Sequence, residues 1–74
     1  MKESSELPAL EKFLNERIVV HVKDGRRLRG LLTEYDNYMN LLLEDAEELS
    51  ENDEVIKRYK RILVKGGNVQ SVST

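Results

Sequence analysis

Residues 18–45 read IVVHVKDGRRLRGLLTEYDNYMNLLLED, and their pattern decides the fold. Apolar side chains recur at every second position through Ile18, Val20 and Val22, which is typical of a half-buried β-strand. Asp24-Gly25 follows and is a strong hairpin signal, because a type I′ turn needs positive φ at both central residues. The segment therefore predicts a strand, a tight turn and a return strand.

The return strand starts at residue 26 or 27 and runs to Tyr35, with Gly30 inside it. A glycine within a strand usually marks a sharp bend or a bulge, which small barrels use to close on themselves. Asp36-Asn37-Tyr38 is a polar break, and Met39–Leu43 is a third apolar strand. We expect three consecutive antiparallel strands, the second of them bent.

The flanking segments complete the element order. Before the strands, apolar residues spaced by three and four predict a short amphipathic helix that ends near residues 15–17, with Ser5 as its N-cap. After them we expect an acidic loop at residues 47–53, a long fourth strand at 54–65, a tight turn at Gly66-Gly67 and a fifth strand at 68–72. One helix followed by five antiparallel strands predicts a mainly β, strongly bent small barrel.

The chain has 74 residues, and we expect a flexible N-terminus at residues 1–6 and a single domain at 7–74. So small a domain buries only about 60% of its unfolded surface and is marginal alone. There is no cysteine for a disulfide or a thiolate metal site, and the one histidine, His21, cannot build a zinc site unaided. We therefore expect no cofactor and no metal, and support from partner subunits.

No apolar stretch approaches the ~20 residues of a membrane span, and the first ten residues lack the apolar core of a signal peptide. We expect no membrane partner and a cytoplasmic location. The net charge of −2 argues against nucleic acid as a partner on average, but the charge is segregated. Seven of the 14 acids lie between Glu44 and Glu54, while cations cluster elsewhere. The clusters are Arg26, Arg27 and Arg29, and Lys57, Arg58, Lys60 and Arg61. We expect the first cluster to be solvated, with contact to a nucleic-acid backbone or to a neighbouring subunit as the alternatives.

Two segments together resemble the motifs of the Sm and Sm-like (LSm) family. Residues 18–45 resemble the first motif, with glycines in the turn and the bend, and then Asp36, Tyr38 and Met39-Asn40-Leu41. Residues 62–69, ILVKGGNV, resemble the second motif. The resemblance covers about residues 7–72 and is closest to the archaeal-type small Sm-like proteins.

This resemblance implies an N-terminal helix that caps a five-stranded SH3-like barrel. It also implies a homo-oligomer, most often a heptameric ring, in which strand four of one subunit pairs with strand five of the next. A head-to-tail contact whose rotation closes produces such a ring. The implied ligand is uridine-rich single-stranded RNA, and the implied role is RNA processing or RNA stability, with RNA-processing proteins as further partners.

The resemblance also places the loops at residues 36–40 and 65–68 around the pore. Tyr38 would stack on a base, Asn40 would hydrogen-bond the base edge, and Asp36 would orient the loop. Lys65 would cover the other face of the base or meet phosphate. Stacking combined with amide contacts is how proteins select unpaired RNA bases. The complete set of RNA-binding residues expected from the resemblance is Asp36, Tyr38, Asn40, Lys65, Gly66, Gly67 and Asn68.

Two positions depart from the family pattern. Lys65 stands where arginine is usual, and Gly67 stands where an acid or asparagine is usual. Lysine keeps the charge but lacks the planar guanidinium that stacks and forks hydrogen bonds, so we expect weaker or less selective RNA binding. The alternative is a ring-shaped scaffold that binds protein, with Tyr38 an ordinary loop aromatic and Lys65 a solvated strand end.

An enzyme would need a nucleophile with its base, paired carboxylates at a defined separation, or a metal cluster. The acids of residues 44–54 read as a charge run, and His21 lies on the outward face of its strand with no nucleophile beside it. We therefore expect no catalytic residues and no enzymatic activity.

Overall fold

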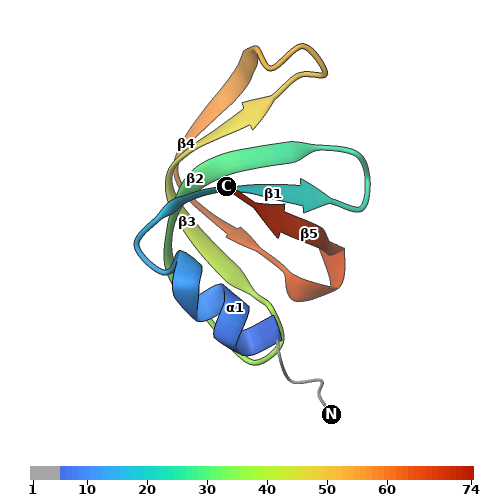
Figure 1. The fold of residues 1–74 in the computed structure, drawn as a ribbon. Helices are drawn as coiled ribbons and strands as arrows, with labels where there is room; N and C mark the ends of the chain where they lie inside the picture. Colours follow the sequence, from blue (N-terminus) through green and yellow to red (C-terminus); the bar gives the residue numbers. More distant parts are fainter. Residues whose placement is uncertain (1–5) are drawn as a thin grey trace.

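The computed structural model describes residues 6–74, in which one α-helix precedes a five-stranded antiparallel sheet (Figure 1). The elements are α1 (Glu6–Phe13), β1 (Arg17–Val22), β2 (Arg27–Tyr35), β3 (Leu41–Leu49), β4 (Val55–Val64), the 3-10 turn η2 (Gly66–Asn68) and β5 (Val69–Ser73). This confirms the predicted mainly β fold. The predicted N-cap, Ser5, and the first five residues of the N-terminus predicted to be flexible (1–6) lie outside the described residues, whereas Glu6 begins α1.

The sheet bends around a core built from alternate strand residues. Ile18 and Val20 of β1 are fully buried, and Val22 is 3% exposed, which confirms the predicted alternation. Leu10 packs into the same core from α1. The helix ends at Phe13, earlier than the predicted residues 15–17, and Asn15 then takes a positive φ of 66° and donates its N–H to the carbonyl of Leu32 at 2.7 Å. No described helix has the length and apolarity to cross a membrane.

The turn between β1 and β2 differs from the predicted one. Only Gly25 has a positive φ (100°) there, so the type I′ conformation is wrong. The N–H of Val22 donates to the carbonyl of Arg26 at 2.8 Å, which leaves three residues in the loop. A three-residue hairpin needs a left-handed conformation only at its last position, where glycine stands.

Gly30 sits at a bend in β2, as predicted. The pairing of β2 with β3 shifts register between Arg29 and Leu31. A Cβ at residue 30 would lie 3.0 Å from the Cβ and 3.1 Å from the Cα of Ala46. The bend brings the two strands too close for a larger residue.

The predicted acidic loop at residues 47–53 is wrong in its first part, because β3 continues to Leu49. Asp45 has a positive φ of 49° and breaks the alternation, so that Ala46 and Leu49 point into the core after Leu43. Glu47 then lies on the other face of a strand. The third strand also starts two residues later than predicted, because Met39 has a φ of 66° and belongs to the preceding turn.

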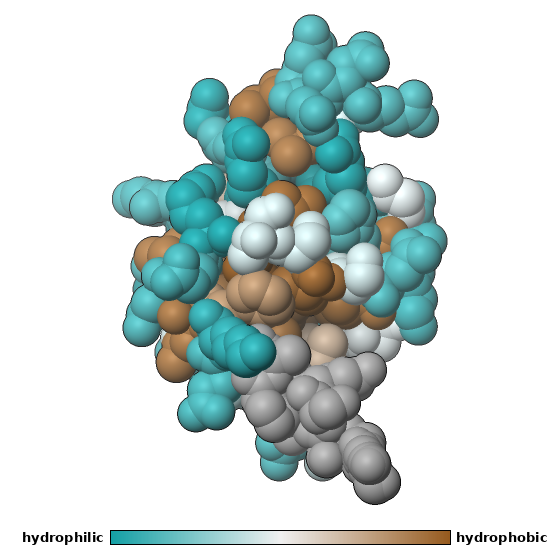
Figure 2. Space-filling view, viewed as in Figure 1, coloured by the Kyte–Doolittle hydropathy of each residue, from teal (hydrophilic) through white to brown (hydrophobic). Residues whose placement is uncertain are grey.

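The sheet order β4-β3-β2-β1-β5 leaves the outer edges of β4 and β5 without a partner strand in the described chain. The β3–β4 hairpin projects from the barrel at the end away from α1 (Figure 1). Figure 2 shows hydrophobic surface on this hairpin amid hydrophilic surface. Along β4, Ile56 is 61% and Leu63 is 58% exposed, so the free edge also carries exposed apolar side chains.

Candidate functional site

The structure brings together the two loops at residues 36–40 and 65–68. The link is a hydrogen bond of 2.7 Å from the N–H of Gly66 to Oδ1 of Asn40. The first loop connects β2 to β3, and the second follows β4. Residues 26 positions apart in the chain therefore form one surface.

Asp36 fixes the shape of the first loop. Its Oδ1 accepts the backbone N–H groups of Tyr38 (2.9 Å) and Asn40 (3.0 Å), and its Oδ2 accepts Nδ2 of Asn40 at 2.9 Å. Its carbonyl accepts the N–H of Met39 at 3.1 Å. A short acidic side chain that binds the backbone ahead of it in this way stabilises a tight turn.

These donors stabilise the ionised form of Asp36. The side-chain hydrogen bond from Asn40 is the largest cause that lowers the pKa of Asp36, followed by the two backbone N–H groups and the charge of Lys65; desolvation opposes them. Lys65 therefore lies near enough to act on the first loop. The carboxylate stays ionised below its ordinary pKa of 3.8.

Asn40 is the bridge between the loops, and its partners fix the orientation of its amide. Nδ2 faces the carboxylate of Asp36, and Oδ1 faces the N–H of Gly66. A flipped amide would put donor against donor and acceptor against acceptor. Each bond uses one of two available hydrogens or lone pairs, so the amide keeps one donor and one acceptor for a ligand.

Gly66 is required by space. A Cβ at this position would lie 1.7 Å from the carbonyl oxygen of Tyr38 and 2.8 Å from its carbonyl carbon. A Cβ at Gly67 would meet nothing within 4 Å. The two adjacent glycines thus have different roles, and only the first is needed to let the loops approach each other.

Tyr38 and Lys65 carry the exposed side chains of the surface. Tyr38 is 80% exposed, and its ring is therefore open to a flat ligand. Asn68 contributes through its backbone: its N–H donates to the carbonyl of Lys65 at 2.9 Å, and its carbonyl accepts the N–H of Lys23 at 2.8 Å. It fastens the second loop to the end of β1.

A hollow of about 130 Å³ lies beside the bridge. It is lined by Asp36 and Asn40 and by four residues that the sequence did not single out as site residues: Glu34, Tyr35, Leu42 and Leu63. Leu42 and Leu63 are cross-strand partners in β3 and β4. The apolar runs at residues 41–43 and 62–64 were the available signal, but only the register shows that the pair lies next to Asn40.

The prediction that the first cationic cluster, at residues 26–29, is merely solvated is wrong. The three arginines near the first turn each form an ion pair: Arg26 with Asp24 (2.9 Å), Arg27 with Asp53 (2.7 Å) and Arg29 with Glu47 (2.7 Å).

Among the described residues there is no group of three or more His, Cys, Asp or Glu side chains that could hold a metal ion. His21 lies 3.4 Å from the hydroxyl of Ser73.

Comparison with known proteins gives a consistent result. The LSM domain family matches residues 8–74. A protein of Archaeoglobus fulgidus named as snRNP Sm-like is 40% identical over 67 residues, which cover 90% of this chain and 86% of that protein. The structure is also similar to that of the Pyrococcus abyssii Sm protein in complex with a uridine heptamer (37% identity, TM-score 0.86, covering 90% of this chain and 93% of that chain). It is likewise similar to the SmAP1 heptamer of P. aerophilum (30% identity, TM-score 0.86, covering 97% and 95%).

Proposed function

The chain belongs to the LSM domain family, and from that premise we propose that it forms a heptameric ring that binds uridine-rich single-stranded RNA through the loops at residues 36–40 and 65–68. The observation that carries this proposal is the amide of Asn40. It is fixed between Asp36 and Gly66, retains one donor and one acceptor, and lies two residues from an 80% exposed tyrosine. A fixed amide beside an open ring suits an unpaired base.

The fixed orientation of the amide is what can select uracil. Uracil presents a donor at N3 and an acceptor at O4, whereas cytosine presents an acceptor at N3 and a donor at N4, so an amide held in one orientation can distinguish the two bases. Tyr38 supplies a stacking face worth about 1–3 kcal/mol per base. Lys65 adds a cation that can meet phosphate, although it lacks the stacking plane of arginine.

The ring is supported by the open edges of β4 and β5. Pairing the β4 edge of one subunit with the β5 edge of the next would satisfy both edges and cover Leu63. The similar P. aerophilum protein is a heptamer, and the similar P. abyssii protein binds a uridine heptamer. A ring repeats one weak pocket in every subunit, so the RNA gains affinity by multivalency.

We place the proposed ring in RNA processing or RNA stability in the cytoplasm, with RNA binding and not catalysis as its activity. The test is native mass spectrometry for the ring and fluorescence anisotropy with oligo-U against oligo-C for the ligand. A preference for oligo-U by an intact ring is the expected result. Equal, weak binding of both by an intact ring would favour the protein-binding scaffold, and a stable monomer at micromolar concentration would exclude the ring mechanism.

Two variants locate the pocket. Tyr38→Ala removes one stacking face per subunit and should weaken oligo-U binding at least about fivefold, since each face is worth about 1 kcal/mol or more. Asn40→Ala should reduce the difference in affinity between oligo-U and oligo-C, because it deletes the group that meets the base edge. It should also weaken binding of both, because the N–H of Gly66 loses its acceptor. If both variants bind like the parent while rings stay intact, the pocket lies elsewhere.

A further inference from the structure

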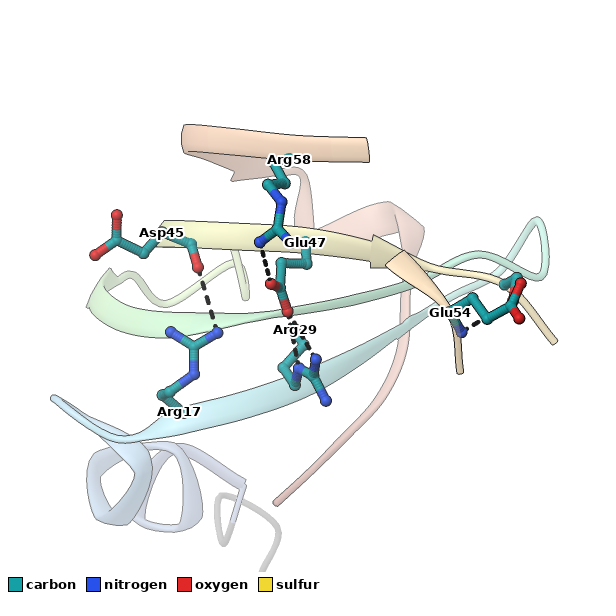
Figure 3. A network of polar contacts seen from close by, with 7 residues as sticks. Arg17, Arg29, Asp45, Glu47, Glu54 and Arg58 are labelled. Carbon is teal, nitrogen blue, oxygen red and sulfur yellow. Dashed lines mark hydrogen bonds and ion pairs between the residues drawn. The ribbon is translucent and has the colours of Figure 1, made fainter. Parts of the chain in front are cut away.

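The outward face of the sheet carries a row of charges that is separate from the two loops. Glu47 on β3 accepts from Arg29 of β2 at 2.7 Å and from Arg58 of β4 at 2.6 Å (Figure 3). These three residues are cross-strand partners in consecutive strands. The carboxylate is 16% exposed, while Arg58 is 72% exposed and extends past it toward solvent.

A hollow of about 390 Å³ lies beside this row. Its cations are Arg17 of β1 and Arg58 and Lys60 of β4; its other lining residues are Asp45, Ala46, Glu47 and Tyr59. Arg17 donates to the backbone carbonyl of Asp45 at 3.3 Å, an uncharged oxygen. Figure 3 shows Arg17 and Arg58 reaching the strand from opposite sides.

The charges around this hollow do not cancel. The three cations that line it, Arg17, Arg58 and Lys60, face two acids, Asp45 and Glu47. This excess of one positive charge stands on a chain whose net charge is −2. Within the described residues, this is a local cationic surface on an acidic protein, and such a surface attracts polyanions.

We propose that this hollow is a second RNA contact, which binds phosphates of a strand that extends beyond the two loops. The inference rests on the proposed function for the identity of the polyanion. Two guanidinium groups and an ammonium around one concave site match phosphate oxygens, which accept forked hydrogen bonds from arginine. Contacts of this kind carry no sequence information and should serve any single strand long enough to reach them.

The choice of RNA over an acidic protein segment rests on the proposed function, in which the same ring already holds RNA at the two loops. Tyr59 lines the hollow but packs against the core and donates its hydroxyl to Glu48 at 3.3 Å, so the hollow offers a ligand its cations and no stacking face. Inorganic polyphosphate and poly-glutamate, as competitors of labelled RNA, separate these two chemistries.

The experiment compares oligo-U of about 7 nucleotides with oligo-U of about 30 nucleotides, since single-strand sites typically span about 4–16 nucleotides. The test variant is Arg17→Gln combined with Lys60→Gln, which leaves the Glu47 row intact. Lys57→Gln is the control for the Lys60→Gln change: it also removes one positive charge from β4, and its ammonium lies 5.2 Å from the centroid of the Tyr59 ring without lining the hollow. Native mass spectrometry confirms that each variant forms the parent's ring.

The double variant should bind the long RNA about two- to fivefold more weakly, in line with exposed charge pairs, and bind the short RNA like the parent. Its salt dependence should be shallower by about 0.7 in log–log slope for each phosphate that the variant no longer neutralises. Arg17→Lys, which keeps the charge, should bind the long RNA nearly as well as the parent. Polyphosphate should compete better than poly-glutamate.

The second RNA contact would be overturned if the double variant had the same long-RNA affinity and salt slope as Lys57→Gln and the parent. It would also be overturned if poly-glutamate competed as strongly as polyphosphate. The proposed function fails separately, when the parent binds neither RNA or when Tyr38→Ala leaves short-RNA binding unchanged. If the parent bound long RNA but not short RNA, the proposal of a base-binding pocket at the two loops would fail, and the proposal of a phosphate contact at the hollow would stand.

Discussion

Asp36 and Glu47 are both carboxylates held by several donors, and the two regions around them work differently. The donors to Asp36 are the side-chain amide of Asn40 and two backbone N–H groups of one loop. The partners of Glu47 are two arginines at the ends of long side chains on separate strands. The pKa is lowered in both, chiefly by the hydrogen bond from Asn40 in Asp36 and from Arg29 in Glu47.

The difference is one of geometry. Backbone donors and an amide with both ends occupied hold the loop in a single conformation, so a small change there displaces every group. Arginines can move to water or to another oxygen when their partner is removed, so the row of charges supports the sheet without fixing it. The loop region should therefore be intolerant of substitution and the row of charges tolerant.

The largest expected effect comes from the closest approach in the loop region. Gly66→Ala places a Cβ where the carbonyl of Tyr38 stands, and relieving that clash should cost about 1–3 kcal/mol or more. The midpoint of thermal unfolding should fall by about 4–8 °C per kcal/mol, and oligo-U binding should be lost. Gly67→Ala is the matched control, and it should change stability by no more than about 0.5 kcal/mol. Equal effects of the two variants would show that the loops do not approach as described.

A second comparison makes the same chemical change in both regions. Asp36→Asn replaces one acceptor oxygen with an NH2 group that faces other donors, so it should weaken oligo-U binding about tenfold or more. Glu47→Gln should change short oligo-U affinity less than about twofold, because Glu47 touches neither loop. Anisotropy titrations of the two variants measure the contrast. A greater loss of oligo-U affinity in Glu47→Gln than in Asp36→Asn would contradict the proposal that the loops, and not the row of charges, bind the short RNA.

The pH dependence of stability should separate the regions as well. Each carboxylate has a lowered pKa when folded, so its stabilisation is complete above its ordinary pKa and is lost as the pH falls through the lowered value. As the pH falls, the loss of stability begins near the ordinary pKa of each group, which is 4.5 for Glu47 and 3.8 for Asp36. Thermal unfolding from about pH 7 to about pH 2 measures how much less stable each variant is than the parent. As the pH falls, this difference in unfolding free energy should begin to shrink at a higher pH for Glu47→Gln than for Asp36→Asn. Differences that stay constant over the whole range would contradict the role of these charges.

The smallest expected effect is a gain. Lys65→Arg adds a planar group that can stack on a base without changing the charge, and it should tighten oligo-U binding about two- to fivefold. The slope of affinity against salt should stay as in the parent, because the number of neutralised phosphates is the same. An affinity and a salt slope both equal to those of the parent would mean that Lys65 meets phosphate only.

Much of the fold could be predicted because its signals are local. The alternation in β1, the turn glycine and the bend at Gly30 each depend on neighbouring residues, and each is where it was expected. The second half of β3 could not be read in this way. Its acids look like a solvated loop until Arg29 and Arg58 are known to lie beside Glu47, and the left-handed Asp45 hides the alternation.

The candidate site divides along the same line. The residue types of the two loops were recognisable from the family motifs, and the structure places them together. The sequence could not show that Gly66 must be a glycine while Gly67 need not be, since this follows from an approach between residues far apart in the chain. For the same reason it could not show that Asn40 has already committed half of its hydrogen-bonding capacity within the protein.

The two free strand edges have a consequence for how the proposed ring would form in time. A pair of subunits joined by β4 and β5 still presents one edge of each kind, and so does every longer arc. Growth therefore ends only when the last subunit closes the circle and leaves no edge behind. Partial arcs should therefore be scarce, with whole rings abundant at high concentration and free subunits abundant on dilution.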